Sequence, residues 1–222
     1  MVLYFVIFGS LIGPRIGQID GHNYIEYLAP GLIMMAVINN SFANVVASFF
    51  GAKFQRNIEE MFVAPMSSWV ILVGFILGGI TRGCIVGLIV TCVALFFTKL
   101  HVHHFGVVLL VVLCTAMLFS LAGLLNAIFS RKFDDINIIP TFILTPLTYL
   151  GGVFYSINML GPFWQKLSYF NPILYMINAF RYGMLGTSDV SVYTSLSFII
   201  GANVICFLLA WRLLSKGTGL KA

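Results

Sequence analysis

Long apolar runs constrain this chain more than any other feature of its sequence. A helix that crosses a bilayer needs about 20 apolar residues. Soluble proteins carry about a quarter charged residues, whereas this chain is 60% hydrophobic and only 9% charged. The bilayer must therefore be its solvent. We predict full spans at Tyr27–Phe50, Trp69–Leu100, Phe105–Ser130, Ile138–Tyr155 and Tyr193–Leu214.

The run Met1–Gly13 is apolar but too short to span a membrane alone. We interpret it as the outer end of a truncated first helix, which brings the predicted number of transmembrane helices to six. The sequence thus predicts an all-α polytopic membrane protein, with residues 1–222 forming a single transmembrane domain.

The distribution of basic residues predicts the orientation, because cytoplasmic loops are enriched in Lys and Arg. If the C-terminus is cytoplasmic, seven basic residues fall in inside segments: Lys53, Arg56, Arg131, Lys132, Arg212, Lys216 and Lys221. Four fall in outside segments: Arg15, Lys99, Lys166 and Arg181. We therefore expect a multi-pass protein of a bacterial inner membrane with both termini in the cytoplasm.

The stretch Lys53–Pro65 has the pattern of a short amphipathic helix. One face would carry Phe54, Ile58, Met61 and Phe62, and the other Gln55, Arg56, Asn57, Glu59 and Glu60. Such a helix either lies along the membrane surface or docks on a cytosolic partner. Its pattern does not separate these two alternatives.

Several ordered segments resemble the type-2 ABC export permeases. They are YLAPGLIMM at Tyr27–Met35, IEEMFVAP followed by Trp69–Arg82, FDDINIIPTFILTPLTYLGGVFYS, and FNPILYMINAFRYGMLG. Within that family the chain is similar to the YadH-type permeases of enterobacteria. The resemblance covers nearly the whole chain.

The resemblance implies a coupling helix after the second span, which contacts a separate ATPase. The residues it assigns to this contact are Lys53, Phe54, Arg56, Ile58, Glu59, Glu60 and Phe62, with Arg131, Asp134 and Asp135 in a second cytosolic turn. By the charge rule alone, that turn is equally well an ordinary solvated turn.

The same resemblance implies the partners. Two ATPase subunits would bind ATP and Mg²⁺, and a second permease copy would complete a homodimer in the lipid bilayer. No cofactor on this chain and no nucleic-acid partner are expected. The transported substrate would be a drug, lipid, glycolipid or polysaccharide.

Two polar lines occur within the predicted spans. Asn40, Asn44 and Ser48 recur at four-residue spacing, and Thr141, Thr145 and Thr148 form a similar line beside two prolines. They either line a translocation path between two subunits or make interhelical hydrogen bonds, which are worth about 0.6 kcal/mol each.

On the membrane face expected to lie opposite the coupling helix, Ser156–Pro172 is rich in Pro, Gly and aromatic residues. The resemblance makes it a pair of re-entrant helices forming an external gate, with Phe163, Trp164, Tyr169 and Phe170. The alternative is an ordinary interfacial aromatic belt. Arg82 is expected near an interface, and His101, His103 and His104 are expected to be polar loop residues and not a metal site.

The chain contains no G-x-x-x-x-G-K-[ST] sequence, so it has no phosphate-binding loop of that kind for hydrolysing ATP. An ion-coupled secondary transporter is the alternative function, but it would be expected to have carboxylates inside the spans. All seven acidic residues lie in predicted loops or at helix ends. A membrane-embedded enzyme is disfavoured, because no nucleophile, base or metal ligands gather at one depth. The resemblance therefore implies the permease subunit of an ABC exporter, and these two alternatives are less well supported by the sequence.

Overall fold

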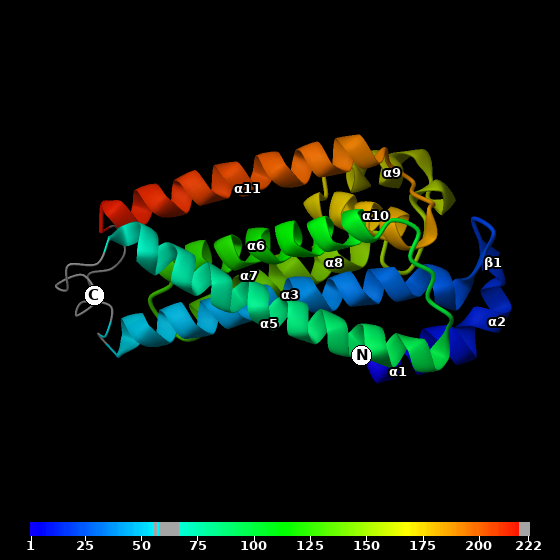
Figure 1. The fold of residues 1–222 in the computed structure, drawn as a ribbon, viewed down its shortest axis with the longest axis horizontal. Helices are drawn as coiled ribbons and strands as arrows, with labels where there is room; N and C mark the ends of the chain where they lie inside the picture. Colours follow the sequence, from blue (N-terminus) through cyan, green and yellow to red (C-terminus); the bar gives the residue numbers. More distant parts are fainter. Residues whose placement is uncertain (56, 58–66, 218–222) are drawn as a thin grey trace.

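The protein is a bundle of long helices in a computed structural model that describes residues 1–55, 57 and 67–217 (Figure 1). Among these residues, four helices are long and apolar enough to cross a membrane: α3 Tyr24–Phe54, α5 Ser68–Phe97, α6 Phe105–Phe129 and α11 Val192–Ser215. They confirm four of the predicted spans, and the all-α membrane class with them.

A fifth, broken helix runs along the bundle as α7 Asp135–Ile139, the π-helix η2 Pro140–Leu144 and α8 Thr145–Leu150. Its helical backbone ends before Gly152, whose φ of 78° is a left-handed conformation that glycine adopts readily at helix ends. The predicted span Ile138–Tyr155 is therefore shifted. The helix falls short of the roughly 20 residues of a full span, so the prediction of six transmembrane helices is not confirmed.

The remaining elements lie at one end of the bundle, which we call the hairpin end. The chain begins there with α1 Val2–Tyr4, the π-helix η1 Phe5–Ile12 and α2 Gly13–Ile16. A hairpin of β1 Gln18–Ile19 and β2 His22–Asn23 follows. The later elements at this end are η3 Ile157–Met159, α9 Pro162–Ser168 and α10 Pro172–Leu185. The opposite end, where α3, α6 and α11 finish, is called the C-terminal end.

The hairpin connects α2 to α3. Its turn residues Asp20 and Gly21 have φ angles of 51° and 81°. Two consecutive residues with positive φ are typical of a type I′ turn, for which Asp-Gly is a favoured sequence. This compact hairpin places the start of α3 directly beside α2.

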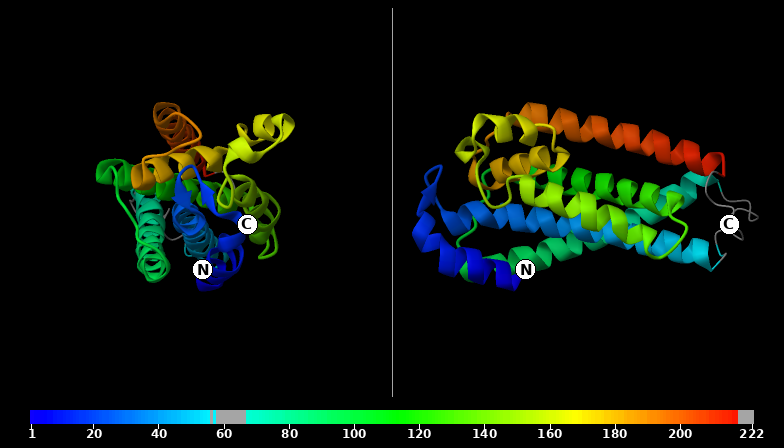
Figure 2. Two further views of the ribbon diagram at one scale, coloured as in Figure 1. Left: turned by 90° about the vertical axis from the view of Figure 1, so that its right-hand side faces the viewer. Right: turned by 180° about the vertical axis from the view of Figure 1, so that it is seen from behind.

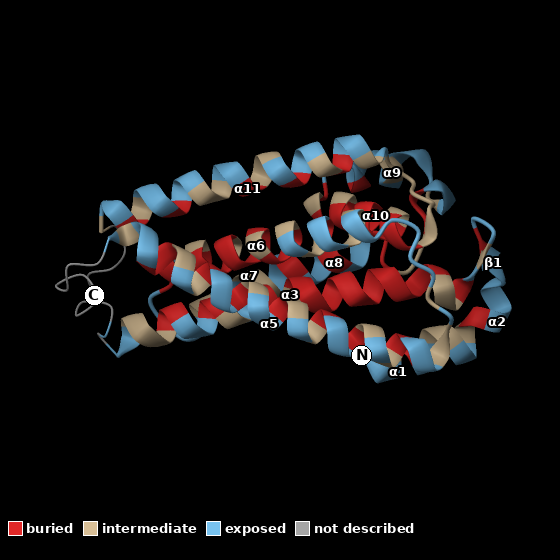
Figure 3. Cartoon of the chain, in the orientation of Figure 1, coloured by how far each residue is buried: buried red, intermediate tan, exposed pale blue. Residues whose placement is uncertain are grey.

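Helix α3 forms the core of the bundle. Of its most apolar stretch, 67% is buried inside the protein, against 22% for α5 and 17% for α11. Viewed end-on, α3 lies among the other helices, whereas α11 lies at the edge (Figure 2). Figure 3 shows the same contrast in burial along the helices. Helices α5 and α11 therefore present most of their surface to lipid.

Close packing around α3 depends on small residues in its neighbours. Gly79, Gly83 and Gly87 on α5 all face α3, and a Cβ atom at Gly87 would lie 2.8 Å from a methyl carbon of Val37. On α6, a Cβ atom at Gly123 would lie 2.6 Å from the carbonyl oxygen of Phe42. Membrane helices associate through such close approach, because lipid leaves little hydrophobic driving force between them.

We predict that Gly123→Ala destabilises the bundle by about 1–3 kcal/mol, since the backbone of Phe42 cannot move aside as a flexible side chain would. Gly106→Ala, on the same helix, is the matched control, because no atom lies within 4 Å of the added methyl group there. Unfolding in mixed micelles measures both variants. Equal stability of the two variants would contradict the packing argument.

Candidate functional site

The C-terminal end of the bundle contains a set of contacts that we call the clasp. Lys53, in the last turn of α3, donates hydrogen bonds from Nζ to the carbonyl oxygens of Ile128 and Ser130, both at 2.9 Å. The last carbonyls of a helix have no partner within the helix and carry a partial negative charge. Lys53 therefore caps the end of α6.

Aromatic rings form the second part of the clasp. Phe133, in the turn after α6, packs edge-to-face on Phe50 and on Phe54 of α3, with ring centroids 5.1 and 4.9 Å apart. Asn126 Nδ2 also donates to the carbonyl oxygen of Ile136 at 3.0 Å, which joins α6 to α7. The end of α3, the end of α6 and the start of α7 are thus connected as one unit.

Asp135 holds the turn within this unit. Its Oδ2 accepts hydrogen bonds from the backbone N–H groups of Arg131 and Lys132, at 2.9 and 3.0 Å. These bonds, and first the one from Arg131, lower the pKa of Asp135 below its ordinary value. A lowered pKa means that the stabilisation is fully present at neutral pH and is lost only as pH falls through the lowered value.

The predicted coupling residues divide between the described and the undescribed parts of the chain. Arg56, Ile58, Glu59, Glu60 and Phe62 lie outside the described residues. Lys53 and Phe54 lie in the clasp, and Arg131 and Asp134 are exposed beside it. The structure thus gives Lys53 an intramolecular contact that the sequence did not indicate, and its contact with an ATPase stays a prediction.

The predicted polar line on α3 interrupts an otherwise buried helix. Ser48 is exposed, and Asn40 and Asn44 are partly exposed. Asn40 and Ser48 bond to carbonyl oxygens one turn earlier on α3, at 2.9 and 2.7 Å. Asn44 instead accepts from Arg82 Nη1 of α5 at 3.3 Å, so the line faces a neighbouring cation. Arg82 itself is exposed and lies near the middle of α5.

The three threonines of the second predicted polar line differ in exposure. Thr141 and Thr145 are exposed, whereas Thr148 is fully buried. Thr145 Oγ1 donates to the carbonyl oxygen of Pro140, five residues back, in the π-helical segment η2. Thr148 Oγ1 donates four residues back, to Leu144, at 2.7 Å. The three threonines therefore do not share one environment, because packing at the hairpin end covers Thr148, and their part in a translocation path stays a prediction.

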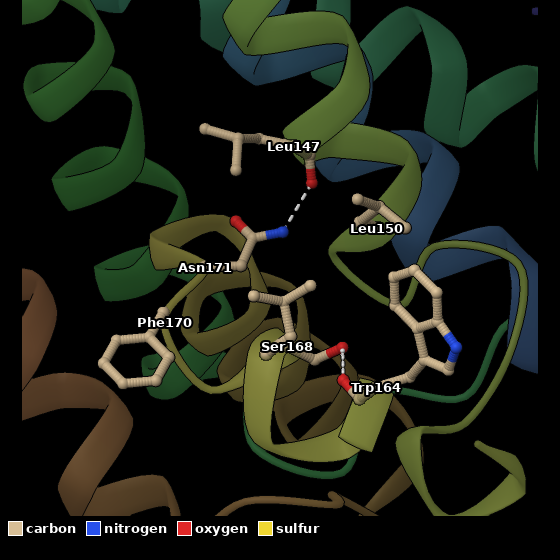
Figure 4. A pocket seen from close by; sticks show the side chains of 7 residues that line it. Leu147, Leu150, Trp164, Ser168, Phe170 and Asn171 are labelled. Carbon is tan, nitrogen blue, oxygen red and sulfur yellow. Dashed lines mark hydrogen bonds between the residues drawn. The ribbon is translucent and has the colours of Figure 1, made fainter. Parts of the chain in front are cut away.

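The predicted gate residues lie on and after α9. All four are exposed, from 44% for Tyr169 to 85% for Phe170. Trp164 and Phe170, but not Phe163 or Tyr169, line a pocket of about 230 Å³ between α8 and α9 (Figure 4). Asn171 Nδ2 donates across this pocket to the carbonyl oxygen of Leu147 at 2.6 Å. The stretch holds the three-residue 3-10 turn η3 and the short helix α9, and the predicted pair of re-entrant helices and its role as a gate stay a prediction.

Sequence reasoning missed a buried polar cluster at the hairpin end. Arg181, on α10, is 1% exposed, and its carbon Cζ lies 3.8 Å from the ring centroid of Tyr27. Its guanidinium donates to Tyr27 Oη and to the carbonyl oxygen of Gly152, both at 2.7 Å. Asp189 Oδ2 lies 4.0 Å from Arg181 Nη1. Arg181, which was counted among the basic residues of the outside segments, is therefore a buried residue of the core.

Asp189 connects this cluster to the segment that follows α8. Its Oδ1 accepts from Ser156 Oγ at 2.7 Å and from Asn158 Nδ2 at 3.2 Å. Its Oδ2 accepts from the backbone N–H of Ile157 at 3.1 Å. The sequence did contain a signal for the helix around Arg181, because Asn171-Pro172 is typical of a helix start and Gly186 of a helix end. In the structure Asn171 and Gly186 flank α10, and Gly186 has a left-handed φ.

The histidines next to α6 pack on this end without forming a metal site. The rings of His103 and His104 lie 6.0 and 5.7 Å from that of Tyr182. Within the described residues, no group of three or more His, Cys, Asp or Glu is arranged to hold a metal ion.

Known proteins are similar in sequence to this chain over most or all of its length. The ABC-2 type transporter family matches residues 1–185. The inner membrane transport permease YadH of Escherichia coli strain K12 is 55% identical over 222 residues, which are 100% of this chain and 87% of that protein. Nodulation protein J of Rhizobium leguminosarum bv. viciae is 24% identical over 216 residues, 97% of this chain and 83% of that protein. The corresponding protein of Rhizobium meliloti is 22% identical, with 97% and 82% covered.

We predict that Asp189→Asn destabilises the protein by about 3 kcal/mol, because it leaves the buried Arg181 without a compensating charge. Adding Arg181→Met to this variant should cost less than the sum of the two single changes, since the residues share one network. Asp134→Asn is the control, because Asp134 is exposed at the C-terminal end, away from Arg181, and its side chain makes no capping hydrogen bond. Additive effects of the two changes, measured in mixed micelles, would rule out the network.

Proposed function

Because the chain belongs to the ABC-2 type transporter family, we propose that it is the membrane-spanning subunit of an ATP-driven exporter. Members of this family are transport permeases and not themselves ATPases. The ATP and Mg²⁺ would be bound by two copies of a separate ATPase subunit. Two copies of this chain, most simply a homodimer, would form the membrane part, with both termini in the cytoplasm.

The clasp is the observation that supports this mechanism. The proposed coupling segment Lys53–Pro65 begins in the last turn of α3. A displacement of that segment by the ATPase would reach α6 and α7 through Lys53 and Phe133, because these residues join the helix ends. Coupling needs an element with two discrete arrangements, and helix ends joined by a few contacts provide one.

The transported molecule would move along the exposed polar line of α3. Asn40, Asn44 and Ser48 interrupt the buried surface of that helix, and Arg82 lies beside them. Together they offer hydrogen-bond donors and acceptors and one positive charge in an apolar bundle. This chemistry suits an amphiphilic cargo with polar or anionic groups, within the drug, lipid, glycolipid and polysaccharide classes.

An ion-coupled secondary transporter is less well supported. In the four described spans the only carboxylate is Glu26, which lies in the first turn of α3. Asp189 is buried but lies between α10 and α11, and both of its oxygens accept hydrogen bonds. Proton or ion relays need carboxylates inside the spans that are available to titrate.

We predict that the chain co-purifies in detergent with an ABC ATPase subunit from the same organism, and that Glu59→Arg with Glu60→Arg abolishes the complex. Two reversed charges would place repulsion in the proposed contact. Glu26→Arg at the hairpin end is the matched control and should leave the complex intact. If a well-folded chain never binds an ATPase subunit, the exporter proposal fails.

We further predict that Lys53→Met leaves this complex assembled but lowers transport-coupled ATP hydrolysis at least fivefold. The variant removes the ammonium group that caps α6 while keeping a flexible apolar stem of similar length. Lys132→Met is the control, because Lys132 is exposed on the adjacent turn and its side chain contacts no described partner by hydrogen bond or ion pair. Equal hydrolysis rates of the two variants in proteoliposomes would exclude the clasp from coupling.

A further inference from the structure

A groove opens between the ends of α6 and α11, and its lining includes neither Lys53 and Phe133 of the clasp nor the polar line of α3. Its volume is about 480 Å³, within the range typical of ligand sites. Apolar side chains form most of the wall, and two cations stand at its rim; the lining residues are Leu125, Phe129, Leu209, Arg212, Leu213 and Lys216.

The two cations lie on one face of α11. Arg212 and Lys216 are four residues apart, a spacing that places their side chains side by side on a helix. Both are exposed, and neither side chain donates a hydrogen bond to a described residue. Within the described residues, no acidic group lies within 4.0 Å of either cation. They can therefore act together on one anion.

The apolar part of the groove faces lipid. Phe129 is 65% exposed and Leu209 is 49% exposed, although both belong to helices that span the membrane. The inner face of α11, with Ala210 and Leu214, is buried against the bundle. The groove is therefore an open furrow beside the packed interface between the two helices.

Trp211 places this part of α11 at the membrane surface. It precedes Arg212 and is 45% exposed, and tryptophan is enriched at the level of the lipid headgroups. At that depth the cations of the rim meet headgroup phosphates, whereas the apolar wall below them meets acyl chains. Basic pockets between membrane helices bind anionic lipid headgroups in this way.

We propose that this groove is a binding site for an anionic phospholipid. Arg212 and Lys216 would hold the phosphate, and Leu209, Leu213 and Phe129 would contact an acyl chain. Charge complementarity selects this occupant, because a zwitterionic lipid would place a choline or amine group against two cations that no acidic side chain of the described residues pairs with. The site is independent of the exporter proposal, since it uses neither the ATPase contact nor the polar line of α3.

Native mass spectrometry of the full chain tests the proposal, with phosphatidylglycerol and phosphatidylcholine added in equal amounts in mild detergent. The wild type should retain phosphatidylglycerol preferentially. Arg212→Gln with Lys216→Gln should reduce its retention about thirtyfold, because two cations at roughly 1 kcal/mol each near a membrane surface add up to about 2 kcal/mol. The charge-conserving pair Arg212→Lys with Lys216→Arg should retain it.

The matched control is Arg131→Gln with Lys132→Gln, which removes two exposed cations at the same end but outside the groove. Leu213→Trp should fill the furrow and lower phosphatidylglycerol retention without a change in charge. Inorganic phosphate at millimolar concentration should not displace the lipid, because it has no acyl chain to occupy the groove.

Three outcomes would overturn the proposal. Equal losses in the groove variant and the control variant would show only general charge attraction. Equal retention of the two lipids by the wild type would remove the selectivity. A groove variant that keeps its lipid but loses a second copy of the chain or an ATPase subunit would identify the groove as a protein interface.

Discussion

The hairpin end of the bundle depends on one guanidinium group that water does not reach, that of Arg181. A buried charge is tolerated only when it is paired and hydrogen-bonded. Arg181 meets this condition through Tyr27 on α3, the carbonyl oxygen of Gly152 and the carboxylate of Asp189. Three parts of the chain that are distant in sequence, at Tyr27, at Gly152 and at residues 181–189, are therefore fixed together. Breaking any one contact exposes a charge to an apolar core, so this end has few alternatives to its observed arrangement.

The C-terminal end is joined by a different kind of contact. Lys53 bonds to two carbonyl oxygens that would otherwise accept from water, so releasing it strands no buried charge. Such a contact is worth about 1–3 kcal/mol, little enough for a partner protein to shift. The aromatic pairs of Phe133 with Phe50 and Phe54 can likewise slide without unsatisfied polar groups. The bundle therefore joins a rigid end to one that can be moved.

The long helices could be predicted from the sequence because the bilayer sets their length directly. Every backbone polar group in lipid must be satisfied within its own helix, so apolar length alone located α3, α5, α6 and α11. The broken helix at Asp135–Leu150 could not be bounded in this way, because its end depends on Gly152 and on a hydrogen bond from Arg181. Helix α10 was not predicted for a related reason. Its sequence contains Arg181, and a charged residue indicates a solvent-exposed loop unless the hydrogen-bond partners of that residue are known.

The site residues show the same division between local and distant determinants. That Asn40, Asn44 and Ser48 share one face follows from helical spacing alone, whereas the exposure of that face and the burial of Thr148 depend on how the neighbouring helices pack. Lys53 is the sharpest case, because its partner Ile128 lies 75 residues away. The sequence placed a cation at the end of α3, where a cytosolic contact and a helix cap are equally reasonable. The position where α6 ends decides between a cytosolic contact and a helix cap, because it brings the last carbonyl oxygens of α6 to Lys53. Lys53 therefore caps α6, while its own helix leads into the segment that is proposed to bind the ATPase.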